Sequence, residues 1–145
     1  MSFSLSAQER TFSMIKPAAV QEHHIGGIID MIEKAHLSIA GLKMQRLSTE
    51  QAEAFYAEHK GKPFYNDLVK MMSSGPIVLM VIEGDGAVAK LREVVGSTDP
   101  KKANVGTIRA TFGKSVGDNA IHASDSPESA TREISFFFSE EEIAQ

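Results

Sequence analysis

Small and polar residues surround a single histidine, His122, in the segment from Asn119 to Ser126. A neutral imidazole has one bare nitrogen at pH 7, which can be phosphorylated if the other nitrogen is held in place. Glu133, immediately before an expected strand, is a candidate for holding it. The alternative is a structural loop histidine without a chemical role. No HExxH or comparable ligand spacing is present, which disfavours a zinc site built by the protein.

Two cations stand where they could reach an anionic ligand. Arg92 falls on the inward-facing stripe of an expected helix over 87–95, and Lys16 ends an expected strand just before Pro17. A guanidinium fork matches the oxygens of a phosphate. The alternative for Arg92 is that its aliphatic part lies along the edge of the core while its guanidinium reaches water. The alternative for Lys16 is a solvent-exposed side chain at the end of a strand.

Three further side chains sit on a surface that should face other structure or a ligand. Tyr56 and His59 share the apolar stripe of an expected helix, where a buried-edge role is the alternative. Phe64 follows Pro63 and is either part of the core or an exposed ring that stacks on a nucleotide base.

Two glycine patterns resemble nucleotide-binding motifs. Gly84 to Ala89 fits G-x-G-x-x-A between an expected strand and an expected helix. The acidic residue of a dinucleotide fingerprint is missing about 20 residues later, so a tight turn is the favoured interpretation. Gly113-Lys114-Ser115 resembles the end of a P-loop, but Ile108 stands where the first glycine is required, and we reject this match.

The elements that must position these residues are read from apolar periodicity. Strands are expected over 10–16, 37–47, 77–82 and 134–138, with a bulge near Ala40-Gly41 and burial of both faces over 77–82. Helices are expected around 25–32, from a capping box at Ser48 to Gln51, after Pro63, over 87–95 with Gly96 behind it, and from Ser126 onward. This order predicts an α/β sandwich of one sheet under several helices.

The segment from 97 to 125 has no clear period. Loops longer than roughly 12–15 residues in a compact domain are usually functional or disordered. This segment holds Thr98, Arg109, Asn119 and His122, so chemistry is expected there.

Composition bounds the class of protein. The chain has 145 residues, a formal net charge of −4 and no cysteine, which fits one domain over 1–145 and excludes disulfides, thiolate metal sites and a cysteine nucleophile. The longest apolar run, Ile77 to Ile82, is far shorter than the roughly 18 residues of a membrane span. Met1 to Arg10 does not have the pattern of a secretory signal. A cytoplasmic protein that needs neither membrane nor nucleic acid is expected.

The combined motifs resemble the nucleoside diphosphate kinase family. The resemblance runs from about Arg10 to Phe138. Its motifs are Ile15-Lys16-Pro17, Phe55-Tyr56-x-x-His59-Lys60, Pro63-Phe64, Ser74-Gly75-Pro76, the helix with Arg92, Gly106-Thr107-Ile108-Arg109 and, most specifically, Asn119 to Ser126.

The resemblance implies a fold and a reaction. The fold would be a ferredoxin-like α/β (α+β) sandwich, a four-stranded antiparallel sheet covered by helices. The reaction would transfer the terminal phosphate of a nucleoside triphosphate to a nucleoside diphosphate by a ping-pong mechanism with broad base specificity. Mg²⁺ would bind through the nucleotide phosphates, and the chain would form a homotetramer or homohexamer.

The same resemblance implies roles for individual residues. His122 would carry the phosphate transiently, and Phe64 would stack on the base. Lys16 and Asn119 would hold the ribose hydroxyls and the nearby phosphate, and Tyr56, Ser124 and Glu133 would support the histidine. The other phosphate ligands would be His59, Arg92, Thr98 and Arg109.

Three positions depart from the family pattern. Ala18 and Thr111 replace aspartates, and Ala123 replaces a glycine beside the nucleophile, where it disfavours a positive φ. Two other functions stay open at this point. One is a nucleotide-binding module without catalysis, and the other is a dinucleotide-dependent oxidoreductase suggested by Gly84 to Ala89.

Overall fold

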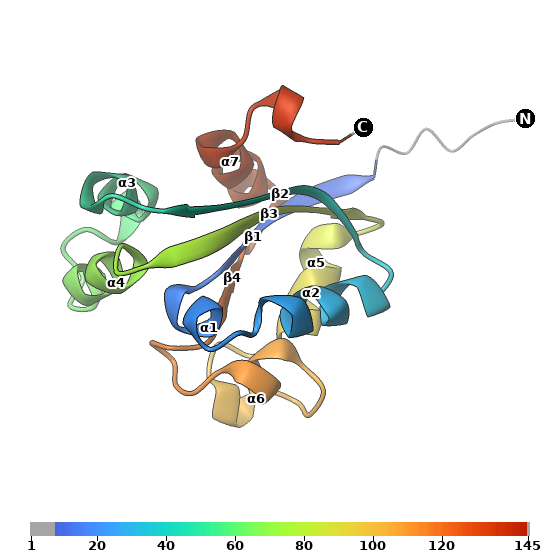
Figure 1. Ribbon diagram of the computed structural model, residues 1–145, viewed down its shortest axis with the longest axis horizontal. Coiled ribbons are helices and arrows are strands. Elements are labelled where there is room, and N and C mark those ends of the chain that lie inside the picture. The colour runs from blue at the N-terminus through green and yellow to red at the C-terminus, as the bar shows by residue number, and fades with distance from the viewer. Residues whose placement is uncertain (1–7, 145) are drawn as a thin grey trace, which may run out of the picture.

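Four strands form one antiparallel sheet in the order β2-β3-β1-β4 in this computed structural model, which describes residues 8–144 (Figure 1). The strands are β1 (Glu9–Ile15), β2 (Ser38–Arg46), β3 (Pro76–Gly84) and β4 (Ile121–Ala123). The central strand β1 pairs with β3 on one side and with β4 on the other, so that Met14 lies opposite His122. This pairing brings Lys16, at the end of β1, close to the start of β4.

Helices cover both faces of the sheet. On one face, α3 (Thr49–Phe55), α4 (Tyr65–Met72) and α7 (Pro127–Phe137) bury a cluster that includes Phe12, Met14 and Leu79. On the other face lie α1 (Pro17–Gln21), α2 (Ile25–Lys34), α5 (Ala87–Val95) and α6 (Ile108–Phe112), over Ile15, Val78 and Met80. The described residues also form three short 3₁₀ helices: η1 (Ala57–His59), η2 (Pro100–Lys102) and η3 (Glu140–Glu142).

The architecture is the ferredoxin-like α/β sandwich. Strands and helices follow the β-α-β-β-α-β plan, with α3 and α4 inserted between β2 and β3. Figure 1 shows the inserted pair at one end of the sheet, beyond the ends of β2 and β3. Among the described residues, no helix is long and apolar enough to cross a membrane. The expectation about a secretory signal falls mostly on residues 1–7, which lie outside the described residues.

Several local expectations are confirmed. The residues of β3 from Ile77 to Ile82 are buried on both faces, as their uniform apolar character predicts. The register of β2 against β3 shifts between Ile39 and Gly41, where the bulge was expected. Ser48 and Gln51 form the expected capping box, in which each side chain accepts a hydrogen bond from the other residue's backbone N–H.

The expected strand over 134–138 is wrong. Residues 134–137 complete the long helix α7, Phe138 follows it in an extended conformation, and the fourth strand is instead the short β4. Ser126 accepts a hydrogen bond from the N–H of Ser129 and Pro127 occupies the first helical position, so a helix begins there. Ala130, Glu133 and Phe137 then fall on one buried helical stripe. Helix propagation and packing against β1 outweigh the local preference of consecutive phenylalanines for strand.

The segment from 97 to 125 is more ordered than its composition indicates. It contains η2, α6 and β4, each three to five residues long. The helix expected to include His59 ends at Phe55, and His59 belongs to η1. Elements this short hold too few residues for an apolar period to be seen.

Candidate active site

The strand β4 and the rings behind it fix His122. The central position on β4 points its side chain to the face covered by α3 and α7, and the hydroxyl of Ser13 donates to its carbonyl oxygen at 2.7 Å. The imidazole packs against two rings, with centroids 5.7 Å from Phe55 and 6.0 Å from Phe12. Packing against these two aromatic rings therefore restricts the orientation of the imidazole, in addition to its polar contacts.

Glu133 determines which nitrogen of the imidazole is free. Nε2 of His122 lies 2.8 Å from Oε1 of Glu133, and the hydroxyl of Ser124 donates to the same oxygen at 2.6 Å. Burial by itself raises the pKa of Glu133, but the contacts with His122 and Ser124 lower it below its ordinary value. An ionised carboxylate only accepts, so Nε2 carries the proton of a neutral ring and the lone pair lies on Nδ1. Among residues 8–144, Nδ1 has no hydrogen bond.

Lys16 and Asn119 form a buried polar pair beside the histidine. Nζ of Lys16 donates to Oδ1 of Asn119 at 2.8 Å, and Nδ2 of Asn119 donates to the carbonyl of Thr98 at 3.1 Å. Burial, together with the charge of Arg109, lowers the pKa of Lys16 to about 8, against a smaller raising effect of Asp118. Lys16 is therefore charged at pH 7, and an anion beside it would favour that charge further.

Two arginines are held near β4 by backbone carbonyls. Arg109 is buried and donates to the carbonyls of Gly96 at 3.2 Å and Ile121 at 2.9 Å. Burial and the charge of Arg92 lower the pKa of Arg109 to about 10, which leaves it charged at neutral pH. The expectation that Arg92 faces inward is wrong: it is exposed beside the buried stripe of α5, and its Nη1 donates to the carbonyl of Ala123 at 3.2 Å.

These side chains line two hollows that share His122 and Thr98. The wide hollow, about 580 Å³, is lined by Lys16, Tyr56, Phe64, Asp67, Leu68, Met71, Thr98, Val116, Gly117, Asn119 and His122. The narrow hollow, about 220 Å³, is lined by Glu58, His59, Arg92, Thr98, Arg109, His122, Ala123, Asp125, Ser129 and Glu133. The structure thus gathers the eleven predicted site residues except Ser124 along two adjoining walls, with Ser124 directly behind Glu133.

Tyr56, His59 and Phe64, which follow α3 in the chain, differ in exposure. Tyr56 is buried, and burial with the charge of Glu133 raises the pKa of its hydroxyl, so it stays protonated. It has no hydrogen bond to His122 among the described residues. The ring of His59 lies 5.3 Å from that of Phe64, and Phe64 is 49% exposed at the mouth of the wide hollow.

Sequence reasoning missed several residues around the site. Phe55 packs on the imidazole, and its place on an apolar stripe predicts burial but not its neighbour. Lys62 lies 3.2 Å from Nδ1 of His59, a contact within a turn that no period reveals. Asp67 was detectable, because it stands at helical spacing from Phe64 and Met71 on the stripe that faces the wide hollow.

The three departures from the family pattern, Ala18, Thr111 and Ala123, lie in α1, α6 and β4. Ala123 lies in β4 and is not among the residues with positive φ, so the expected difficulty there is wrong; Ala120 has the positive φ of 76° instead. Ala18 lies in α1, whose first turn carries no acidic side chain. The hydroxyl of Thr111 donates to the carbonyl of Thr107 one turn earlier in α6.

The near-match motifs lie apart from His122. Gly84 ends β3 and Gly86, with φ of 59°, precedes α5, so this segment is the tight strand-to-helix turn that was favoured. None of Gly84 to Ala89 lines either hollow. Lys114, in the rejected P-loop match, pairs with Glu22 instead.

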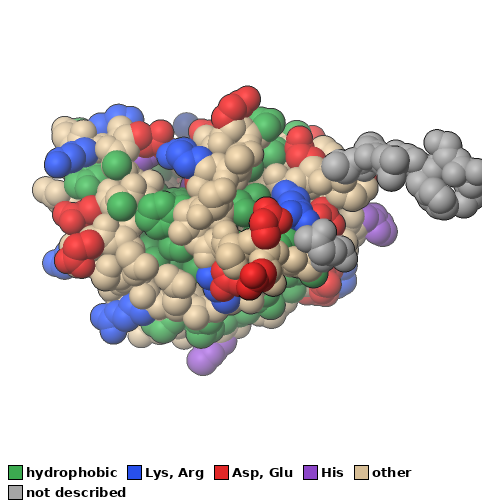
Figure 2. Space-filling model, turned by 90° about the horizontal axis from the view of Figure 1, so that it is seen from above, with side chains coloured by type: hydrophobic (Ala, Val, Ile, Leu, Met, Phe, Trp, Pro, Cys, Tyr) green, Lys and Arg blue, Asp and Glu red, His purple; other side chains and the backbone are tan. Residues whose placement is uncertain are grey.

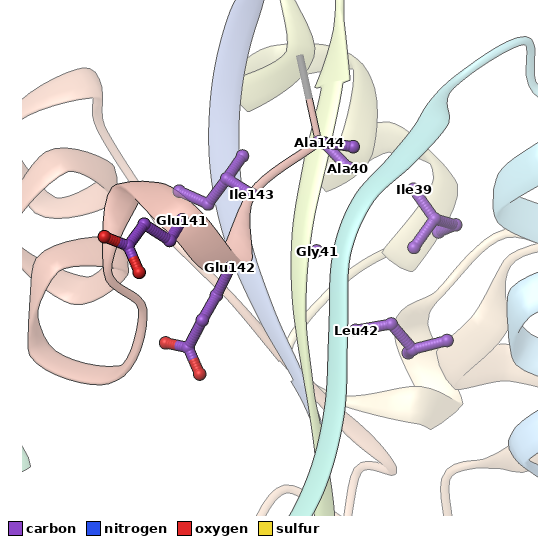
Figure 3. A pocket seen from close by; sticks show the side chains of 8 residues that line it. All are labelled: Ile39, Ala40, Gly41, Leu42, Glu141, Glu142, Ile143 and Ala144. Carbon is purple, nitrogen blue, oxygen red and sulfur yellow. The ribbon is translucent and has the colours of Figure 1, made fainter.

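A third hollow, at the edge of the sheet, differs in chemistry. It is lined by Ile39, Ala40, Gly41, Leu42, Glu141, Glu142, Ile143 and Ala144, and holds about 500 Å³ (Figure 3). Figure 3 shows Ile39 and Leu42 pointing away from the two glutamates across β2. Its charged lining side chains are both acidic, which disfavours an anionic ligand. Over the face seen in Figure 2, acidic and basic side chains are interspersed, so the net charge is not gathered there into one patch.

Comparison with known proteins places this site in a family. The family model described as nucleoside diphosphate kinase matches residues 9–143. The chain is 56% identical over 135 residues to a nucleoside diphosphate kinase of Bdellovibrio bacteriovorus, covering 93% of this chain and 96% of that protein. It is 57% identical over 137 residues to nucleoside diphosphate kinase 1 of Protochlamydia amoebophila, covering 94% and 97%.

Solved structures agree with the sequence relatives. The nucleoside diphosphate kinase of Aquifex aeolicus superposes with a TM-score of 0.92 at 46% identity, covering 95% of this chain and all of that one. A halophilic nucleoside diphosphate kinase from Halobacterium salinarum, solved in complex with CDP, superposes with a TM-score of 0.91 at 41% identity, covering 95% and 92%. The site holds a histidine that Glu133 contacts, close to buried cations, and the relatives match over nearly their whole length. The chain therefore belongs to the nucleoside diphosphate kinase family, enzymes that transfer phosphate between nucleotides.

Proposed function

We propose that Nδ1 of His122 takes the terminal phosphate of a nucleoside triphosphate and then gives it to a nucleoside diphosphate. The 2.8 Å contact between Nε2 and Glu133 carries this proposal, because it leaves the Nδ1 lone pair on a ring that lines both hollows. In the first step the N–P bond forms while the bond from the terminal phosphorus to the bridging oxygen breaks. The nucleoside diphosphate leaves, and a second one reverses these changes. One site thus serves donor and acceptor in turn.

The cations act on the phosphates. Phosphoryl transfer depends mainly on positioning and on positive charge around the transferred group. Arg92 and Arg109 supply that charge from the narrow hollow, and Lys16 supplies it from the wide hollow. His59, Thr98 and Asn119 complete the proposed set, with Asn119 and Lys16 also reaching the ribose hydroxyls. The hydrogen bonds of Lys16 and Arg109 hold both side chains in place before a nucleotide binds.

In this proposal the base lies at the mouth of the wide hollow. Phe64 offers its exposed ring as a stacking surface, with Val116 also lining this hollow. Every base has a π-face, so stacking accommodates purines and pyrimidines alike. The relative solved in complex with CDP supports a nucleoside diphosphate as a ligand of this chain.

Mg²⁺ is proposed to arrive with the nucleotide. Among the described residues, no group of three or more His, Cys, Asp or Glu side chains could hold a metal ion. Lys16, Arg92 and Arg109 line the two hollows as partners for phosphate oxygens, so a metal is expected to bind through the nucleotide phosphates rather than through a protein cage. When bound, Mg²⁺ would neutralise part of the charge on those oxygens.

The assembly and location are proposed on the same family grounds. A homotetramer or homohexamer in the cytoplasm is expected, with no membrane and no obligatory nucleic acid. The exposed apolar side chains of Leu42 and Met44 on the edge strand β2 support association between copies. Light scattering at micromolar concentration distinguishes the two assemblies from a monomer.

The test is phosphate transfer through an isolated intermediate. The protein is incubated with γ-labelled ATP and Mg²⁺, freed of nucleotide, and then given an unlabelled nucleoside diphosphate. The label is expected on the protein as an acid-labile, base-stable adduct, and then on the new triphosphate. His122→Ala should do neither, while His23→Asn, at an exposed position whose positive φ asparagine tolerates, should do both.

Two results would overturn the proposal. One is unchanged labelling of a folded His122→Ala, and the other is nucleotide binding by the unmodified protein without any transfer. The second would instead favour a binding module.

A further inference from the structure

Asp67 is an acidic side chain at the mouth of the wide hollow that none of the proposed steps uses. It is the only carboxylate lining that hollow in the part of the chain that the structure describes. It is exposed, and among residues 8–144 it has neither an ion pair nor a side-chain hydrogen bond. An exposed carboxylate in this place is free to accept hydrogen bonds from a ligand.

The helix α4 places Asp67 beside the stacking ring. Phe64 precedes the helix, and Asp67, Leu68 and Met71 follow it at spacings of three, four and seven residues, so all four face the wide hollow. A base lying on Phe64 would therefore present its edge toward the turn of α4 that carries Asp67. The phosphates, by contrast, would lie deeper in the site, near Lys16 and His122.

Base chemistry then determines what Asp67 recognises. An ionised carboxylate offers two acceptor oxygens and no donor. Guanine presents N1–H and N2–H side by side and can satisfy both oxygens. Adenine and cytosine each offer one donor, an amino group, beside a ring nitrogen that only accepts. Uracil and thymine offer N3–H between two carbonyl oxygens, and these oxygens would face and repel the carboxylate.

We propose that Asp67 is a specificity-determining residue that favours guanine over uracil and thymine within an otherwise broad base tolerance. The proposal rests on the proposed function, since it assumes that the base stacks on Phe64. A structural alternative exists, because an aspartate in the first turn of a helix also stabilises the helix dipole.

The experiment uses the phosphorylated protein and measures how fast each nucleoside diphosphate removes the phosphate. GDP, ADP, CDP, UDP and dTDP are added separately at concentrations well below saturation, so that the rates report relative kcat/KM. The ratio of GDP to UDP is expected to fall about fivefold in Asp67→Asn, since one exposed charge-assisted contact is lost. The rate at saturation should not change, because this contact is the same in the ground and transition states.

Glu50→Gln is the matched control. Glu50 is an exposed acidic residue in the first turn of α3, and it lines neither hollow, so its replacement makes the same change in net charge and in helix dipole. An unchanged GDP to UDP ratio in Asp67→Asn would overturn the inference. So would a change that is equal for all five nucleotides or is reproduced by Glu50→Gln. If the unmodified protein transfers phosphate to none of the five, the proposed function itself fails, which is a different result.

Discussion

The floor and the rim of the wide hollow are built in opposite ways. The floor, which we define as Lys16, Asn119 and His122, is hydrogen-bonded and largely enclosed: Lys16 is only 8% and Asn119 only 3% exposed, and His122 is partly buried. The rim, which we define as Phe64, Asp67, Val116 and Gly117, is exposed, with Phe64 at 49% and Val116 at 56%. Polar contacts therefore concentrate at the floor, and apolar contact surface concentrates at the rim.

This difference matches the two parts of a nucleotide. The phosphates are the same in every substrate, so they can be held by fixed side chains whose positions are determined before binding. The base varies, and an open stacking surface accepts all of its forms. Replacements near the floor should therefore affect the chemical step and stability, whereas replacements at the rim should affect nucleotide binding alone.

The largest effect is expected for Arg109→Ala, beside the floor. Loss of one charge-stabilising donor typically costs about 3–4 kcal/mol in the transition state, so kcat/KM should fall on the order of 10²–10³-fold, mostly through kcat. The melting temperature should also fall, because the carbonyls of Gly96 and Ile121 lose their donor. Steady-state kinetics and calorimetry measure both. A rise in KM alone, with kcat and melting temperature unchanged, would contradict the distinction between the floor and the rim.

A smaller effect is expected at the rim from Phe64→Ala. Stacking of a base on an aromatic side chain is worth roughly 1–3 kcal/mol, and loss of it should raise KM for purine and pyrimidine nucleotides together. Because Phe64 is half exposed, the melting temperature should hardly change. Phe64→Tyr keeps a ring and serves as the control. A large fall in kcat for the alanine variant would show that the rim also positions the phosphates.

The smallest effect is a pH dependence that belongs to the floor alone. Lys16 has a pKa of about 8 and loses its charge as pH rises through that value, so kcat/KM should fall about tenfold from pH 7 to pH 9. Phe64→Ala should keep this limb of the profile. Lys16→Arg should remove it, since an arginine stays charged. Persistence of the limb in Lys16→Arg would assign it to another group.

The same group has a defined effect on stability. Its folded pKa of about 8 lies below the ordinary lysine value of 10.5, so between these values the unfolded chain binds more protons than the folded one. The contribution of Lys16 to the free energy of unfolding therefore rises with pH across that window. Thermal unfolding of the unmodified protein and of Lys16→Met without nucleotide measures this difference.

The longer elements could be predicted from sequence, and the short ones could not. The buried strand β3 and the capped helix α3 have local signals that extend over several residues. The strand β4 is three residues long, and its place beside β1 depends on pairing with Ser13 and Ile15 far away in the sequence. The phenylalanines at the end of α7 carried a strand signal that helix packing overrode.

The site divides in the same way. The residue types around His122 were recognisable as a motif, since they form one continuous segment. Glu133 was predicted to hold one nitrogen of His122, but which nitrogen it contacts could not be predicted, because that depends on Glu133 lying on a helix rather than before a strand. The ring of Phe55 behind the imidazole likewise depends on how α3 packs across the sheet.

The central claim is that Glu133 holds Nε2 and leaves Nδ1 of His122 to take the phosphate. The most direct measurement is correlated ³¹P and ¹⁵N NMR of protein carrying ¹⁵N-labelled histidine, phosphorylated with ATP and kept at alkaline pH, where phosphohistidine survives. Coupling of the phosphorus to Nδ1 of one histidine, absent in His122→Ala, is the predicted result. Coupling to Nε2, or a phosphate on an oxygen atom instead, would contradict the account.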